Sequence, residues 1–256
     1  MNNLKEKWVL NSKENQVKEI LKLENIFLSY NNKKTYVLKD ISFSVFSWEV
    51  LSIIWVNWSG KSTLLKVIAW IQKIDDWKII KNYKKLSYVP QKISLDKTFP
   101  IKVYEFIKIY NENIDDKKII NYLKKFDSEN LFEKNIASLS GWEFQKILII
   151  SALLNEPELI LLDEPTAWID IIWEEIFYEI IKEVKKLFPK ISIILVSHNI
   201  KLVYKNSDKV ICLHENNFCC HGSPLEVSAN KITESIFGKY TLPYKHNPHN
   251  KSTHNN

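Results

Sequence analysis

The sequence predicts an α/β fold in which helices cover both faces of a mainly parallel sheet. Three apolar runs carry this prediction, at residues 50–54, 159–162 and 191–196. Runs with so little polar alternation are typical of parallel strands that are buried on both faces. Apolar residues with helical spacing separate these runs, at residues 64–68, 103–111, 117–126, 143–155 and 173–187. Strands that alternate with helices in this way form open parallel sheets.

Further strands are expected before and after the first buried run. Residues 21–30 and 37–45 read as two strands, because apolar residues alternate in them and a polar turn separates them. Two shorter strand patterns, at residues 78–80 and 86–89, follow the first helix. The N-terminal part of the chain is therefore predicted to carry antiparallel strands beside the parallel core.

The C-terminal part is expected to close the fold with two short strands, at residues 209–214 and 217–221, and a helix near residues 225–237. No internal repeat divides the chain. We expect an N-terminal extension at residues 1–20, one main domain at residues 21–238 with a helical insertion at about residues 93–151, and a polar, disordered tail with histidines at residues 239–256.

Composition is ordinary for a soluble globular protein: the 256 residues are 45% hydrophobic and 26% charged. The formal net charge is +6, and lysine carries all of the positive charge because the sequence has no arginine. Without guanidinium groups for bidentate base recognition, a nucleic-acid partner is disfavoured. Cys212, Cys219 and Cys220, an odd number, suggest reduced thiols in the cytosol. Residues 1–20 lack the apolar core of a signal peptide, and no apolar stretch approaches the ~18 residues of a membrane helix.

The first buried strand leads into the first helix through the run Trp55-Val56-Asn57-Trp58-Ser59-Gly60-Lys61-Ser62-Thr63. This run matches the pattern G-x-x-x-x-G-K-[ST] of a phosphate-binding loop, except that Trp55 stands at the first glycine. In such a loop, backbone N–H groups and the N-terminus of the helix surround the phosphates. Lys61 would then reach the β- and γ-phosphates, and the Ser62 hydroxyl would bind Mg²⁺.

Other motifs follow this loop in a fixed order. They are Gln91 after a short strand, Leu139-Ser140-Gly141-Trp142-Glu143 before a helix, Asp163-Glu164 at the end of a buried strand, then Asp170 and His198. With the loop, they resemble the ATP-binding subunit of an ABC transporter over roughly residues 21–238. They are similar in turn to the family's Q-loop, signature, Walker B, D-loop and switch histidine. The resemblance implies a RecA-like P-loop NTPase core with a helical signature subdomain.

The resemblance also implies an enzyme that hydrolyses ATP with Mg²⁺. Asp163 would hold Mg²⁺ together with Ser62 and Gln91. Glu164 would orient or deprotonate the attacking water. His198 would contact the γ-phosphate, and Gln91 would sense both Mg²⁺ and the membrane partner.

Two further contacts would complete the nucleotide site. Tyr30 would stack on adenine, since an aromatic face binds a base without many hydrogen bonds. Ser140 and Gly141 of the signature would reach the γ-phosphate of ATP bound to a second copy of the chain. ATP would thus hold a dimer together until hydrolysis releases it. The dimer would lie on the cytoplasmic face of the cell membrane and drive a separate integral membrane permease, with an extracytoplasmic substrate-binding protein as an indirect partner.

Three features resemble the branch of the family that imports divalent metal ions such as zinc, manganese or iron. Residues 91–101 resemble the segment after the Q-loop in those importers, and residues 220–227 resemble a C-terminal segment of the same branch. The tail adds His246, His249 and His254, and histidine suits transition metals.

Tryptophan stands where the family pattern has glycine. The positions are Trp48, Trp55, Trp58, Trp70, Trp77, Trp142, Trp168 and Trp173. The chain has 4 Gly against 9 Trp, whereas glycine makes up about 7% of average proteins. The other motif residues are intact, so random decay does not explain the pattern. We interpret these tryptophans as an artefact of translation, in which a codon that the organism reads as glycine, UGA, is written as tryptophan, because some bacterial lineages reassign that codon.

Two other functions stay open. A soluble ABC ATPase of DNA repair or translation usually has two fused ATPase domains or a long coiled-coil insertion, and the sequence shows neither. A non-hydrolysing relative follows if the tryptophans are genuine, because indoles at Trp55 and Trp58 would fill the phosphate cradle. Turnover of ATP by the native protein would distinguish a non-hydrolysing relative from an ATP-hydrolysing transporter subunit.

Overall fold

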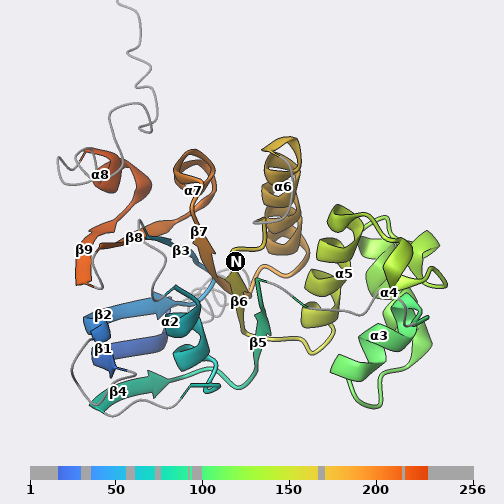
Figure 1. Ribbon diagram of the computed structural model, residues 1–256, viewed down its shortest axis with the longest axis horizontal. Coiled ribbons are helices and arrows are strands. Elements are labelled where there is room, and N and C mark those ends of the chain that lie inside the picture. The colour runs from blue at the N-terminus through green and yellow to red at the C-terminus, as the bar shows by residue number, and fades with distance from the viewer. Residues whose placement is uncertain are drawn as a thin grey trace, which may run out of the picture.

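The computed structural model describes residues 17–29, 36–55, 61–72, 76–91, 93, 100–166, 171–214 and 217–229. Two sheets and the helices around them make up this part of the chain (Figure 1). In the view of Figure 1, the smaller sheet lies at the lower left and a group of helices lies at the right.

The smaller sheet is antiparallel and has the strand order β2-β1-β4. Its strands are β1 (Glu19–Ser29), β2 (Tyr36–Phe46) and β4 (Asp76–Lys81). In β2 the side chains of Ile41, Phe43 and Val45 are buried, whereas their neighbours along the strand are more exposed. This alternation is the pattern from which the strand was predicted, and it turns one face of the sheet toward the core.

The larger sheet is parallel apart from its last strand and has the order β5-β6-β7-β3-β8-β9. Its strands are β3 (Val50–Trp55), β5 (Leu86–Val89), β6 (Leu159–Asp163), β7 (Ser192–Ser197), β8 (Lys209–His214) and β9 (Asn217–Gly222). Every residue of β6 and β7 is buried. Because β5, β6, β7 and β3 are parallel neighbours, their carboxyl ends meet at one edge of the sheet.

Helix α2 (Lys61–Ile68) lies between the two sheets. Its buried Leu64 and Leu65 belong to one apolar cluster with Leu51 and Ile53 of β3 and with the inward face of the smaller sheet. The helix that follows the predicted phosphate-binding loop is thereby fixed against the strand that precedes it.

Helix α6 (Ile171–Leu187) packs on the opposite face of the larger sheet. Its Phe177 is fully buried in a cluster that includes Ile160 of β6 and Leu195 of β7. Two short helices, α7 (Ile200–Asn206) and α8 (Pro224–Ala229), form a third cluster with β8 and β9. Cys212 and Cys220 lie in this cluster as free, buried thiols.

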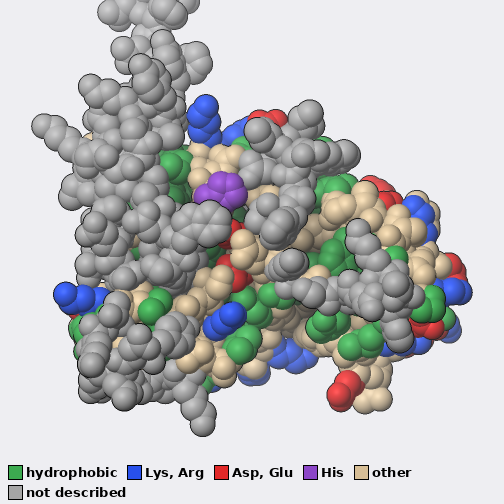
Figure 2. Space-filling model, viewed as in Figure 1, with side chains coloured by type: hydrophobic (Ala, Val, Ile, Leu, Met, Phe, Trp, Pro, Cys, Tyr) green, Lys and Arg blue, Asp and Glu red, His purple; other side chains and the backbone are tan. Residues whose placement is uncertain are grey.

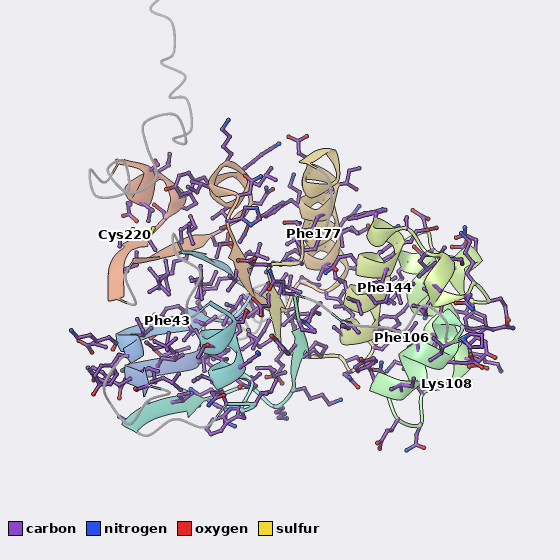
Figure 3. All side chains as sticks on the ribbon, viewed as in Figure 1. Phe43, Phe106, Lys108, Phe144, Phe177 and Cys220 are labelled. Atoms are coloured by element: carbon purple, nitrogen blue, oxygen red, sulfur yellow. The ribbon has the colours of Figure 1, made fainter. Side chains whose placement is uncertain are left out.

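A group of helices follows β5 and precedes β6. It consists of α3 (Val103–Tyr110), α4 (Asp116–Lys125), the 3₁₀ turns η1 (Glu129–Leu131) and η2 (Ile136–Ser138), and α5 (Gly141–Leu153). The rings of Phe106 in α3 and Phe144 in α5 lie 5.7 Å apart between centroids (Figure 3). Asn111, also buried, donates from its side-chain amide to Ser151 Oγ over 2.9 Å. Both contacts fix α3 to α5.

The predicted fold class is confirmed: an α/β core, antiparallel strands near the N-terminus and a helical subdomain before β6. Helix α7, by contrast, was not predicted. Its start is set by Asn199, whose Oδ1 accepts from the N–H of Leu202 over 3.2 Å. The sequence signal was short, since the helix has only 7 residues. Helix α8 begins near the predicted position, and residues 230–237 lie outside the described residues.

Among the described residues, no helix is long and apolar enough to cross a membrane. On the face shown in Figure 2, acidic and lysine side chains are interspersed over the described surface rather than gathered by sign.

Two of the tryptophans at expected glycine positions have a backbone conformation that favours glycine. Trp48, between β2 and β3, has φ 69°, and Trp70, after α2, has φ 62°. Several other residues with positive φ are Asn or Asp, which tolerate this region, whereas a bulky side chain there is strained by about 1–2 kcal/mol. Trp142, in the first turn of α5, is not among the residues with positive φ. The strain therefore falls on particular positions rather than on tryptophan in general.

Candidate functional site

The strand register brings several predicted site residues to one edge of the larger sheet. Asp163, the last residue of β6, pairs with Val196 of β7, so Glu164 and Ser197 follow side by side. Ser197 pairs with Ile54 of β3, just before the predicted phosphate-binding loop. These strand ends form a candidate nucleotide site, in the place where open parallel sheets bind ligands.

Asp163 is the most buried charged group of this site, with 1% of its surface exposed. Burial raises the pKa of its carboxyl group above the ordinary value, while hydrogen bonds from Ser62 and Tyr88 oppose the rise. Tyr88 donates from its hydroxyl to Asp163 Oδ2 over 3.0 Å. The other oxygen, Oδ1, is buried and has no hydrogen-bond partner among the described residues. An orphaned carboxylate oxygen beside a serine hydroxyl suits a hard cation such as Mg²⁺.

Glu164 is held on both its backbone and its side chain. Its N–H donates to the carbonyl oxygen of Val196 over 3.1 Å. The side-chain amide of Gln91 donates from Nε2 to Glu164 Oε2 over 2.8 Å. Glu164 also has φ 42°, a conformation that non-glycine residues seldom adopt and that clusters at functional sites. The structure thus brings together two of the three predicted catalytic residues.

His198, the third, follows β7 and is exposed. The residues on either side of it are fixed: Ser197 Oγ accepts from the N–H of Asn199 over 3.1 Å. The histidine thus stands at the edge that also carries Asp163 and Glu164, with its side chain accessible and its backbone held.

The predicted phosphate-binding loop is described only at its two ends. β3 ends at Trp55 and α2 begins at Lys61, as predicted, while the Ser62 and Thr63 side chains are half-buried. The N-terminus of α2 is therefore directed at the site, with the partial positive charge that phosphate prefers. Other predicted residues lie outside the described part, either whole or in their side chains: Tyr30, Val56, Asn57, Trp58, Ser59, Gly60, Trp168 and Asp170 whole, and Trp55, Lys61, Trp77 and Trp173 in their side chains.

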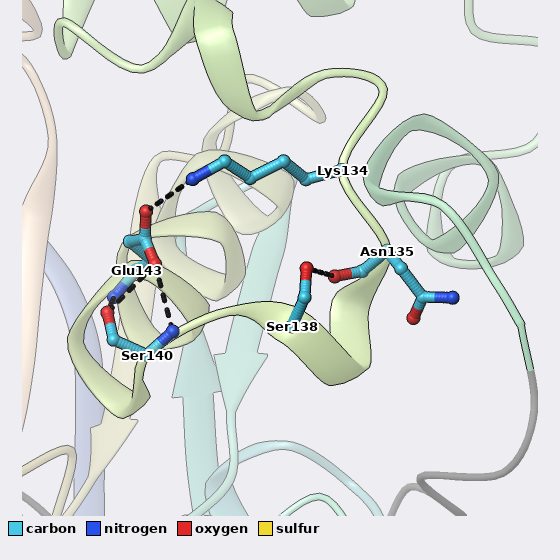
Figure 4. A network of polar contacts seen from close by, with 5 residues as sticks. All are labelled: Lys134, Asn135, Ser138, Ser140 and Glu143. Carbon is cyan, nitrogen blue, oxygen red and sulfur yellow. Dashed lines mark hydrogen bonds and ion pairs between the residues drawn. The ribbon is translucent and has the colours of Figure 1, made fainter.

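The signature residues form the start of α5 (Figure 4). The Ser140 hydroxyl accepts from the N–H of Glu143 over 3.2 Å, and the Ser140 N–H donates to Glu143 Oε2 over 2.9 Å. This reciprocal pair is a capping box, which explains Ser and Glu at this spacing on structural grounds alone. Lys134 Nζ lies 3.1 Å from Glu143 Oε1. The hydrogen bond from the Ser140 backbone, together with Lys134, holds the pKa of the Glu143 carboxyl group below its ordinary value. Ser140 and Gly141 are exposed, whereas Leu139 and Trp142 pack partly against the core.

Tyr88 is a site residue that the sequence prediction missed. It lies on β5 two residues before Pro90, and its partial burial raises the pKa of its hydroxyl, which therefore stays a hydrogen-bond donor. The available signal was a tyrosine in a short strand, three residues before Gln91. Strand order is not readable from the sequence, so the contact with Asp163 could not be predicted.

A groove of about 220 Å³ lies between β5 and the helical group. Apolar and small polar side chains line it, among them Val89, Ile93, Tyr110, Leu148 and Ser151. Tyr110 is 53% exposed, at the end of α3, so an aromatic ring stands at the rim. The groove adjoins Gln91 through the segment that follows β5.

Comparison with known proteins shows clear relatives. The profile of the ABC transporter family matches residues 38–167. The zinc import ATP-binding protein ZnuC of Wigglesworthia glossinidia brevipalpis is 38% identical over 236 residues, which cover 90% of this chain and 100% of that protein. The protein of the same name from Buchnera aphidicola subsp. Baizongia pistaciae is 39% identical over 231 residues, 88% of this chain and 95% of that one.

Solved structures share the fold. CbiO1 of Clostridium perfringens, part of the ABC transporter complex CbiONQ, superposes with a TM-score of 0.72 at 27% identity, covering 83% of this chain and 92% of that chain. A metal-chelate type ABC transporter in an inward-facing conformation gives a TM-score of 0.75 at 23% identity, over 86% of this chain and 89% of that chain.

We predict that the buried carboxylate of Asp163 lowers the stability of the protein when no cation is bound. Its raised pKa means that stability from this group is complete at low pH and is lost as the pH rises through its pKa in the folded protein. We expect Asp163→Asn to raise the Tm at pH 7.5 without nucleotide or Mg²⁺ by about 2–4 °C for each ~1 kcal/mol relieved, with a smaller gain near pH 4. Differential scanning calorimetry measures both.

The matched control is Asp127→Asn, an exposed aspartate whose φ of 47° asparagine tolerates. It changes the net charge equally and should leave the Tm unchanged. Adding ATP and Mg²⁺ should raise the Tm of the parent protein more than that of Asp163→Asn, so that the parent then has the higher Tm. A lower Tm for Asp163→Asn at every pH would contradict the assigned cost of burial.

Proposed function

The chain belongs to the ABC transporter family as an ATP-binding and ATP-hydrolysing subunit, and we propose that it energises the import of zinc through a separate membrane permease. The observation that carries the proposal is the cluster of Asp163, Glu164 and Gln91 at the edge where β3 leads into α2. Two relatives with 38–39% identity, aligned over nearly their whole length, are named as zinc import ATP-binding proteins. We propose zinc rather than manganese or iron on that ground.

The site residues fit a bound Mg²⁺. Asp163 Oδ1, the Ser62 hydroxyl and the Gln91 side-chain oxygen are oxygen donors of the kind that Mg²⁺ binds. When bound with ATP, the ion would neutralise charge on the β- and γ-phosphates. Tyr88 would hold the Asp163 carboxylate in place from Oδ2, leaving Oδ1 for the ion.

Glu164 is proposed as the group that orients or deprotonates the attacking water. In the structure Gln91 donates to one oxygen of this carboxylate, Oε2, and so fixes its orientation. His198, exposed at the same edge, would donate to the γ-phosphate. Lys61, at the first position of α2, would contact the same phosphates.

A dimer is proposed to complete the site. The exposed Ser140 and Gly141 stand at the N-terminus of α5, which has 13 residues and a partial positive charge at that end. They would meet the γ-phosphate of ATP on a second copy of the chain. In that state the Ser140 hydroxyl would bond the phosphate, while Lys134 keeps the Glu143 carboxylate neutralised nearby.

ATPase measurements on the full chain test the proposed site. Glu164→Gln keeps the shape of the side chain but removes its basicity, so we expect kcat to fall about 10²- to 10⁴-fold while ATP still binds and still promotes dimers. Light scattering measures the dimer and phosphate release measures kcat. Undiminished turnover by Glu164→Gln would remove Glu164 from its role.

The permease is proposed to dock, at the cytoplasmic face of the membrane, in the groove between β5 and the helical group. We expect Tyr110→Asp to place a charge at its rim and to reduce copurification with the permease and zinc accumulation by cells. Ile120→Asp is the matched control, because Ile120 is 42% exposed on α4 and does not line the groove. Equal loss in both variants would count against this groove. Accumulation of manganese or iron without zinc would correct the substrate.

Glycine is proposed at the eight tryptophan positions in the protein that the organism makes. The positive φ of Trp48 and Trp70 supports this, as does the need for an open cradle at Trp55 and Trp58. We expect peptide mass spectrometry of native protein to find glycine at positions 48, 55, 58 and 70. Tryptophan at 55 and 58 would instead support a relative that does not hydrolyse ATP.

A further inference from the structure

We propose that Tyr178 is a positioning residue for ATP hydrolysis. Tyr178 acts by fixing the turn that carries His198. Tyr178 lies in α6, outside every motif found in the sequence. Its hydroxyl donates to Ser197 Oγ over 3.2 Å. The inference rests on the proposed role of His198.

The bond between Tyr178 and Ser197 lies inside the protein. Both side chains are only 2% exposed. Water therefore does not compete for either hydroxyl, and a bond made there holds its geometry better than one at the surface. The phenyl ring is also fixed, because it meets the Phe177 ring edge-on with centroids 5.7 Å apart.

Ser197 passes this restraint to the histidine. The same Oγ that accepts from Tyr178 also accepts from the N–H of Asn199 over 3.1 Å. Asn199 in turn caps α7 through Leu202. His198 is the one residue between these two anchors, so its backbone direction depends on where the Ser197 hydroxyl is held.

The contact between Tyr178 and Ser197 also links helix α6 to the turn that carries His198. It begins at Ile171, directly after residues 167–170, and Tyr178 lies two turns further on. A rigid shift of α6 along its axis would move the Tyr178 hydroxyl relative to Ser197. The position of the histidine turn is thereby tied to the helix that follows the segment containing Asp170.

The test uses Tyr178→Phe in the full chain, with the residues that mass spectrometry finds at the tryptophan positions. The ring and its packing stay, and only the hydroxyl is lost. We expect kcat for ATP to fall about fivefold, the scale of one neutral hydrogen bond, with KM for ATP unchanged because Tyr178 does not touch the nucleotide. In a His198→Ala background, Tyr178→Phe should change kcat by less than about 1.5-fold, since a residue that acts through His198 has no effect without it.

Tyr204→Phe is the matched control. Tyr204 is a buried tyrosine on the neighbouring α7, and its hydroxyl has no hydrogen-bond partner among the described residues, so its removal should leave kcat unchanged. Full activity of Tyr178→Phe would overturn the inference. An equal loss with and without His198 would also overturn it, because it would show a purely structural effect. If His198→Ala alone kept full activity, the role of His198 would fall and this inference with it, while Glu164→Gln would still decide the ATPase site.

Discussion

Parallel pairing of β5, β6, β7 and β3 is the constraint on which the rest of the structure depends. Parallel neighbours place all their carboxyl ends at one edge, and Asp163, Glu164 and His198 lie at or just after those ends. A shift of β6 against β7 by one residue would turn Asp163 to the other face of the sheet, so the buried, uninterrupted apolar strands also fix the chemistry. The helices on both faces serve the same end, since they supply the burial that holds the register.

The cost of this arrangement falls on one carboxyl group. Asp163 is buried with one oxygen unpaired among the described residues, and burial raises its pKa. A structure selected for stability alone would place an apolar or neutral residue there. The charge is retained where a cation can share it, which makes the site weaker without its ligand and stronger with it.

The sequence was sufficient for most of the fold. Continuous apolar runs predicted β3, β6 and β7, and helical spacing predicted α3, α4 and α5 to within a few residues. What it could not give were contacts that depend on strand order and side-chain direction. Tyr88 reaches Asp163 only because β5 lies next to β6, and Gln91 reaches Glu164 for the same reason. Helix α7 was missed because its 7 residues offer little periodicity.

The bond between Gln91 and Glu164 has a consequence for an idle subunit. While the amide occupies Glu164 Oε2, one of the two oxygens of the proposed base is engaged, and the segment that holds the amide borders the groove. A partner bound in the groove would contact Pro90, the residue next to Gln91. If docking moved Gln91 away from Glu164, the release of Oε2 would couple ATP turnover to the presence of the partner.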